Sequence, residues 1–278
     1  MLRNQIILSL AALTLLLGLY FGGQRHKKGG EQGQVNMVRG GATANATVPE
    51  FAFQPYADSL ILRLSVADRK KWEELSATHS QPDTQLLKQQ ARFWETQQQA
   101  TLAGYYFKKA AFLENTEKSL TFAGNLFLAV LQKTEQPDLR HWQALQAIAC
   151  YEKVLTLNRN NPDVQVALAT CYTEGTGETM KGVMLLREVT QKDSNHIAGN
   201  LLLGKLAIQS GQYDKAIKRL EKVLKLKEGD TEALYFLAEA YKGSGNKSKA
   251  IELFELCKKK VNRPEFSREI DQYINSFK

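Results

Sequence analysis

Histidine and its hydrogen-bonding partners are the side chains that most often carry catalysis or bind a metal. The segment 193–196, Asp-Ser-Asn-His, contains residue types of a hydrolase triad, but a triad is defined by the roles of its members in space. Asp, Ser and Asn are also preferred caps at helix starts, so we interpret this segment as a helix junction. The four histidines are scattered, and none pairs with cysteine or a carboxylate at metal-ligand spacing: His26, His79, His141 and His196.

A glycine-rich stretch, residues 175–181 (GTGETMK), has some features of a phosphate-binding loop. It lacks both the glycine before Lys181 and the Ser or Thr after it, and no strand pattern precedes it. We therefore interpret residues 174–179 as a long turn between two helices. The sequence predicts no catalytic residue, no metal site and no cofactor, and hence a protein that is not an enzyme.

The basic charge of the chain allows two interpretations. The net charge is +8, and the densest basic cluster is residues 258–260 (Lys-Lys-Lys), with Arg263 nearby. Such a surface could bind anionic lipid, nucleic acid or an acidic partner. The same lysines would also be favoured at the carboxyl end of a helix by the helix dipole, and no nucleic-acid-binding motif accompanies them. A basic surface for anionic lipid or nucleic acid is kept as the alternative function.

The cysteines give a prediction about burial. Cys150, Cys171 and Cys257 lie on apolar faces of predicted helices, and three cysteines cannot all pair within one chain. We predict buried, reduced thiols.

An uncharged apolar run, IILSLAALTLLLGLYF, occupies residues 6–21. It is at the short end of the ~17–25 residues that span a bilayer, and slightly long for the ~7–15-residue core of a cleavable signal. No small-residue cleavage pattern follows directly, whereas Arg25, Lys27 and Lys28 do. We interpret residues 1–23 as an uncleaved transmembrane anchor, with a cleaved signal peptide as the alternative. Residues 24–55, rich in Gly, Gln, Asn and Thr, are expected to form a flexible tether.

After the tether, apolar residues recur at helical spacing and an internal repeat emerges. Small residues would allow paired helices to cross closely, large apolar residues would fill the gaps between crossings, and glycines would form the turns. A shift of 34 residues aligns Leu203-Gly204 with Leu237-Ala238, Gly211 with Gly245, Ala216 with Ala250, and Leu220 with Phe254.

This spacing resembles the tetratricopeptide repeat (TPR), a 34-residue helix–turn–helix unit. The family's first aromatic position is not kept, because Asn200 and Leu234 stand there. The resemblance implies an all-α, TPR-type α-solenoid over residues 56–278. Its clearest repeats would be residues 162–196, 197–230 and 231–264, with degenerate repeats at about 84–161 and a capping helix at 265–277.

In this family the first helix of each unit lines a concave groove that binds peptides or partner helices. These positions do not reproduce the Lys/Asn/Arg set with which some members clamp a terminal carboxylate, and they could equally be partly exposed scaffold positions. Carried over to this chain, the protein-binding positions are Val166, Thr170, Leu201, Lys205, Tyr235, Glu239 and Lys242.

Anchor, tether and repeat array together predict a membrane-anchored scaffold that recruits or organises partner proteins, as in the assembly of envelope complexes. By similarity of layout we expect a single-pass protein of the bacterial inner (cytoplasmic) membrane. The positive-inside rule leans slightly toward a cytoplasmic carboxyl-terminal domain. No small-molecule substrate is expected, and self-association stays open.

Overall fold

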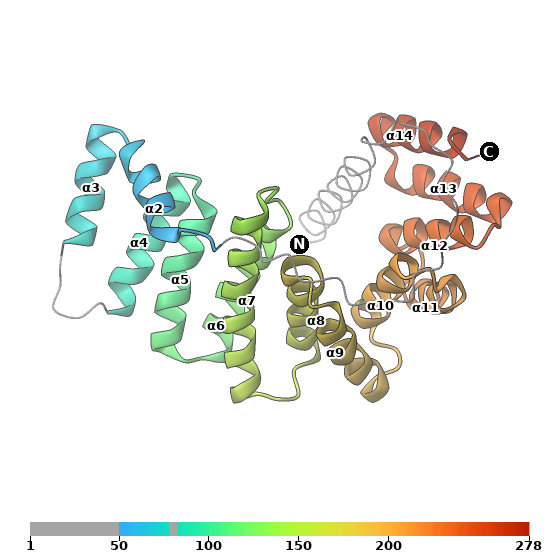
Figure 1. Cartoon of the computed structure of the whole chain (residues 1–278), viewed down its shortest axis with the longest axis horizontal. Helices are drawn as coiled ribbons and strands as arrows, with labels where there is room; N and C mark the ends of the chain where they lie inside the picture. The colour runs from blue at the N-terminus through green and yellow to red at the C-terminus, as the bar shows by residue number, and fades with distance from the viewer. Residues whose placement is uncertain (1–49, 78–82, 278) are drawn as a thin grey trace, which may run out of the picture. The chain divides into compact units, whose positions relative to one another are not determined.

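The computed structural model describes residues 50–77 and 83–277, and within them every regular element is a helix (Figure 1). The predicted anchor, residues 1–23, and most of the predicted tether lie outside this part of the chain. Among the described helices, none combines the length and the apolarity needed to cross a membrane. The all-helical, TPR-like fold class is confirmed.

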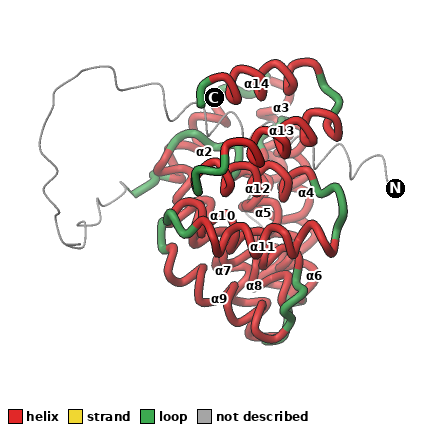
Figure 2. The backbone as a smooth tube through the Cα atoms, turned by 90° about the vertical axis from the view of Figure 1, so that its right-hand side faces the viewer, coloured by secondary structure: helices red, strands yellow, loops and turns green. Residues whose placement is uncertain are grey.

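The described residues form two compact units, one ending at Leu203 and the other beginning at Gly204, and Figure 2 shows the short loops that join their helices. Most neighbouring helices of each unit pack on one another, as the predicted helix pairs require. In the first unit the helices are α2 (Phe53–Leu62), α3 (Val66–Ser76), α4 (Thr84–Thr96), α5 (Ala100–Glu114), α6 (Glu117–Leu131), α7 (Pro137–Leu157), α8 (Pro162–Thr170), a π-helix η1 (Cys171–Thr176) and α9 (Thr179–Lys192). Helix α10 (Ile197–Gln209) contains the boundary, and α11 (Tyr213–Leu226), α12 (Thr231–Gly243), α13 (Lys247–Val261) and α14 (Pro264–Asn275) follow.

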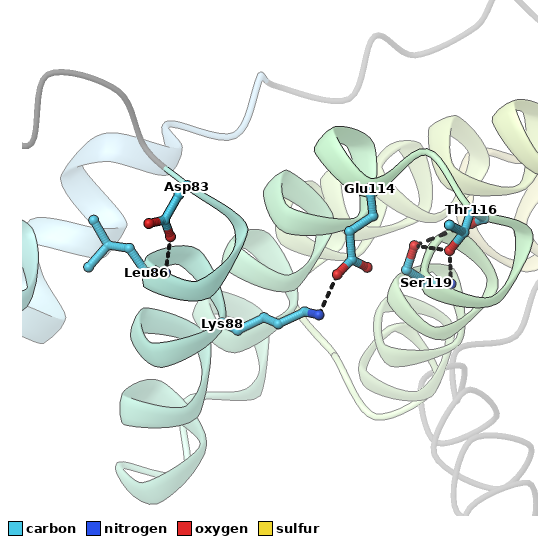
Figure 3. A network of polar contacts seen from close by, with 6 residues as sticks. All are labelled: Asp83, Leu86, Lys88, Glu114, Thr116 and Ser119. Carbon is cyan, nitrogen blue, oxygen red and sulfur yellow. Dashed lines mark hydrogen bonds and ion pairs between the residues drawn. The ribbon is translucent and has the colours of Figure 1, made fainter.

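Short polar side chains start several of these helices. Asp83 caps α4 by accepting a hydrogen bond from the backbone N–H of Leu86 (2.6 Å), and Thr116 caps α6 in the same way. Such caps satisfy backbone donors that a helix start leaves free. Between these two helix starts, Lys88 of α4 forms an ion pair with Glu114 at the end of α5 (Figure 3). The hydrogen bond from Lys88 lowers the pKa of Glu114.

Small residues occupy the helix crossings, as the repeat spacing predicted. A Cβ atom added to Gly204 of α10 would lie 2.9 Å from Cγ of Leu220 on α11. In the first unit, the same addition at Gly104 of α5 would lie 3.2 Å from the ring of Phe127 on α6. The crossings are therefore too close for a larger side chain.

Two helices, α2 and α3, precede the predicted degenerate repeats, which begin at about residue 84. Helix α2 begins at Phe53, in the last residues of the stretch predicted to be tether. Trp72 of α3 packs against Phe93 and Trp94 of α4, with ring centroids 5.4 and 4.9 Å apart. Phe53 stacks on Trp142 of α7 with ring centroids 4.7 Å apart. Aromatic burial thus joins this segment to the repeats.

The long turn predicted at residues 174–179 is wrong in its first half, because the chain continues α8 as the π-helix η1. Gly175 explains the difference. A Cβ at this position would overlap the Cβ of Ala144 on α7 and lie 3.3 Å from Cδ1 of Leu131. The wider π turn brings the glycine backbone against α7, and Gly177 then ends the helix with a φ of 74°.

Replacing Gly204 with leucine tests the helix crossing. Gly204→Leu places carbon atoms where Leu220 already lies, so we expect the free energy of unfolding to fall by about 1–3 kcal/mol in urea titration. Gln209→Leu, at an exposed position of the same helix, is the matched control and should leave it almost unchanged. Equal stability of Gly204→Leu and the natural chain would show that α10 and α11 do not cross here.

Candidate protein-binding surface

In the carboxyl-terminal unit, the predicted binding positions on α12 are largely inside the fold. Tyr235 and Glu239 are only 3% and 4% exposed. The Tyr235 ring lies edge-on to Phe254 of α13, with centroids 5.5 Å apart, and to the neighbouring Phe236 at 5.4 Å. These two predicted positions therefore contribute mainly to the shape and stability of the surface.

Lys242, at the end of α12, contacts the capping helix. Its Nζ lies 3.3 Å from a carboxylate oxygen of Glu239, 4.2 Å from the ring centroid of Tyr273 and 5.5 Å from that of Phe277. It also donates a hydrogen bond to the Tyr273 hydroxyl. A cation against two aromatic faces is a stabilising arrangement, so Lys242 helps to hold the end of the chain on the last repeat.

Lys205 of α10 lies in a partly exposed cluster on the same unit. Its Nζ is 3.4 Å from Oε1 of Glu232 and 5.0 Å from the ring centroid of Phe236, both on α12. All three side chains are half-buried. The cluster presents an aromatic ring beside two opposite charges, which can contact both apolar and charged groups of a partner.

The remaining predicted positions belong to the first unit. Val166 and Thr170 of α8 and Leu201 of α10 are all half-buried. The Thr170 hydroxyl donates a hydrogen bond to the carbonyl of Val166 (3.0 Å). Val166 and Leu201 thus offer apolar surface, whereas the Thr170 hydroxyl is already engaged with its own helix.

Two hydrogen bonds between adjacent repeats were not predicted from the sequence. The Tyr172 hydroxyl donates to Oε1 of Glu152 (2.8 Å), and the Tyr241 hydroxyl donates to Oε1 of Glu221 (2.6 Å). In each pair, the tyrosine lies twenty residues after the glutamate. Lys249 also donates to the Tyr241 hydroxyl (2.7 Å). The shared separation is a signal that a search for polar pairs at repeat spacing could have found.

Asn200 stands where the family has its first aromatic residue, and its contacts explain this departure. It is 3% exposed, and its Nδ2 donates to the carbonyls of Ser194 (3.0 Å) and His196 (2.9 Å). His196 in turn accepts a hydrogen bond from the N–H of Gly199 through Nδ1 (3.1 Å). The segment 193–196 thus joins α9 to α10, as its interpretation as a helix junction predicted.

The structure also places the possible metal ligands, the basic cluster and the cysteines considered in the sequence analysis. No group of three or more metal-ligating side chains occurs among the described residues. In the basic cluster, Lys258 forms ion pairs with Glu255 (3.0 Å) and Asp271. Cys150, Cys171 and Cys257 are fully buried free thiols, as predicted.

The hydrogen bond of Tyr241 can be tested by removing its hydroxyl. Tyr241→Phe leaves the ring in place and deletes the contacts to Glu221 and Lys249, so we expect a loss of about 0.5–1.5 kcal/mol in the free energy of unfolding. The control is Tyr213→Phe, whose hydroxyl forms no hydrogen bond with any described residue. If both variants unfold at the same urea concentration as the natural chain, the inter-repeat hydrogen bond contributes nothing.

Thiol reactivity tests the burial of the cysteines. Burial raises the pKa of Cys150, Cys171 and Cys257 to about 12, which leaves almost no thiolate near pH 8. We expect iodoacetamide to leave all three unmodified in the folded chain and to modify all three in guanidinium, as read by mass spectrometry. Rapid modification of the folded chain at any of them would contradict the packing around that residue.

Comparisons with known proteins agree with the repeat pattern. The family model described as tetratricopeptide repeat matches residues 207–266, and the one described as anaphase-promoting complex, cyclosome, subunit 3 matches residues 140–223. No curated protein matches the chain.

Solved structures show the same fold. The chain is similar to a tetratricopeptide repeat protein from Parabacteroides merdae ATCC 43184, with 20% identity, a TM-score of 0.51, and coverage of 69% of this chain and 75% of that one. It is also similar to TTC0263, a thermophilic TPR protein in Thermus thermophilus, with 14% identity, a TM-score of 0.50, and coverage of 69% and 97%. Residues 207–266 thus carry tetratricopeptide repeat sequence, and the chain has the all-helical fold of TPR proteins.

Proposed function

We propose that this protein is a membrane-anchored scaffold that recruits partner proteins through the first helices of its repeats. TPR proteins in general mediate protein–protein interactions and are typically not enzymes. The observation that carries the proposal is the half-buried cluster of Lys205, Glu232 and Phe236, where two first helices present an aromatic ring and two charges.

The chemistry of this cluster indicates the kind of partner. Phe236 offers an apolar contact, while Lys205 and Glu232 offer charged ones. An amphipathic helix, or an extended segment that alternates apolar and charged side chains, would satisfy both. Because Lys205 and Glu232 already pair with each other, a partner would have to supply an opposite charge to at least one of them.

The membrane part of the proposal rests on the sequence. The apolar run at residues 6–21 and the basic residues after it support an uncleaved single-pass anchor in the bacterial inner membrane. The same charges favour a cytoplasmic repeat domain. A scaffold held at the bilayer would concentrate its partners there, which suits the assembly of envelope complexes.

The proposal is tested by crosslinking the tagged full-length chain in cells and identifying the crosslinked proteins in the membrane fraction. Leu201→Ser with Lys205→Glu changes the first-helix surface without removing a buried residue, and it should abolish a specific crosslink. The matched control, Leu145→Ser with Lys153→Glu on α7, should keep that crosslink.

Retention of the crosslink in both variants would refute the first-helix surface. Release of the chain from membranes by alkaline carbonate would refute the anchor, independently of any partner.

A further inference from the structure

One face of α11 carries a row of lysines that the proposed function does not use. Lys215, Lys218, Lys222 and Lys225 follow one another at helical spacing, and all but the half-buried Lys222 are exposed. The opposite face holds the residues that are buried in the unit: Ala216, Leu220 and Val223. Helix α11 is thus amphipathic, with a lysine row, defined here as these four lysines, turned to solvent.

Most of the positive charge of the lysine row is not neutralised by ion pairs with neighbouring acidic groups. Within the described part of the chain, Lys218, Lys222 and Lys225 form no ion pair with a carboxylate. Of the two acidic residues of α11, Glu221 accepts the hydrogen bond from Tyr241, and Asp214 lies in the first turn. The cluster at residues 258–260 differs, because two carboxylates neutralise Lys258 there.

We propose that the lysine row of α11 docks the repeat domain on anionic phospholipid headgroups. This inference rests on the proposed membrane anchor, which would keep α11 near the bilayer and raise its effective concentration at the headgroups. The ammonium group of each lysine is a point charge, and it is attracted to the negative charge spread over an anionic lipid surface. At the end of the row, Leu226 is 41% exposed between Lys225 and Lys227, where it can enter the headgroup boundary.

A lipid surface fits this face better than nucleic acid does. Single-stranded nucleic acid is held by basic residues together with aromatic rings on which its bases stack. The exposed positions of α11 carry lysines, two acidic residues and Leu226, with no aromatic side chain among them. The row therefore supplies attraction to a negatively charged surface without a means of stacking bases.

The test measures lysine acetylation in the full-length chain, reconstituted in nanodiscs of phosphatidylcholine alone or mixed with phosphatidylglycerol. We expect all four lysines of the row, Lys215 included, to react about fivefold more slowly in the anionic discs, since a lysine near an anionic surface contributes about 1 kcal/mol, a factor of about five. Exposed lysines of the first unit serve as internal controls and should react equally in both: Lys70, Lys118 and Lys133.

Two triple variants make the result specific. Lys218→Gln, Lys222→Gln and Lys225→Gln together should abolish the protection of Lys215. Lys70→Gln, Lys118→Gln and Lys133→Gln remove the same charge elsewhere and should preserve it. Protection should also weaken at high salt, because the attraction is screened.

Equal acetylation rates in the two kinds of disc would overturn the proposal. So would protection by a mixed-sequence single-stranded oligonucleotide without protection in anionic discs. If the chain inserts into neither kind of disc, the proposed anchor is refuted. Acetylation of the chain in the presence of phosphatidylglycerol vesicles then tests separately whether the lysine row binds anionic lipid.

Discussion

The close approach of paired helices at small residues is the constraint on which the rest of this structure depends. A helix pair buries its apolar face only if the two backbones come near each other, and a glycine or alanine at the crossing permits this. Gly204 against Leu220 and Gly104 against Phe127 are two instances. Because each pair then packs on the next, the crossings set where the first helices lie.

The repeat spacing made most of the helix pairs and their turns predictable. Coincident positions such as Gly211 and Gly245 recur because the same turn needs the same backbone freedom, with φ values of 71° and 87°. The π-helix at residues 171–176 was not predictable, because it depends on the contact between Gly175 and Ala144, which are distant in sequence. Helices α2 and α3 lie largely within the predicted helical domain but before its first predicted repeat, so the repeat spacing gave no bounds for them; aromatic contacts such as those of Trp72 hold them.

The candidate surface was only partly accessible to sequence reasoning. Family positions identified which residues lie on first helices, and Leu201 and Lys205 are half-exposed. They could not indicate that Tyr235 and Glu239 are buried, or that Lys242 contacts Tyr273 of α14, because these depend on how the end of the chain packs. Nor could they single out Phe236, which lies beside Tyr235 and contributes the half-buried ring of the cluster with Lys205.

The central claim is that first helices, and not second helices, contact a partner at the membrane. Site-specific photocrosslinking tests it most directly, with a photoreactive amino acid placed in the full-length chain at Phe236 on α12 or at Phe112 on α5, which is 39% exposed. We predict one discrete crosslinked protein in the membrane fraction from position 236 and none from position 112. Equal crosslinking from the two positions, or crosslinking from position 112 alone, would contradict the account.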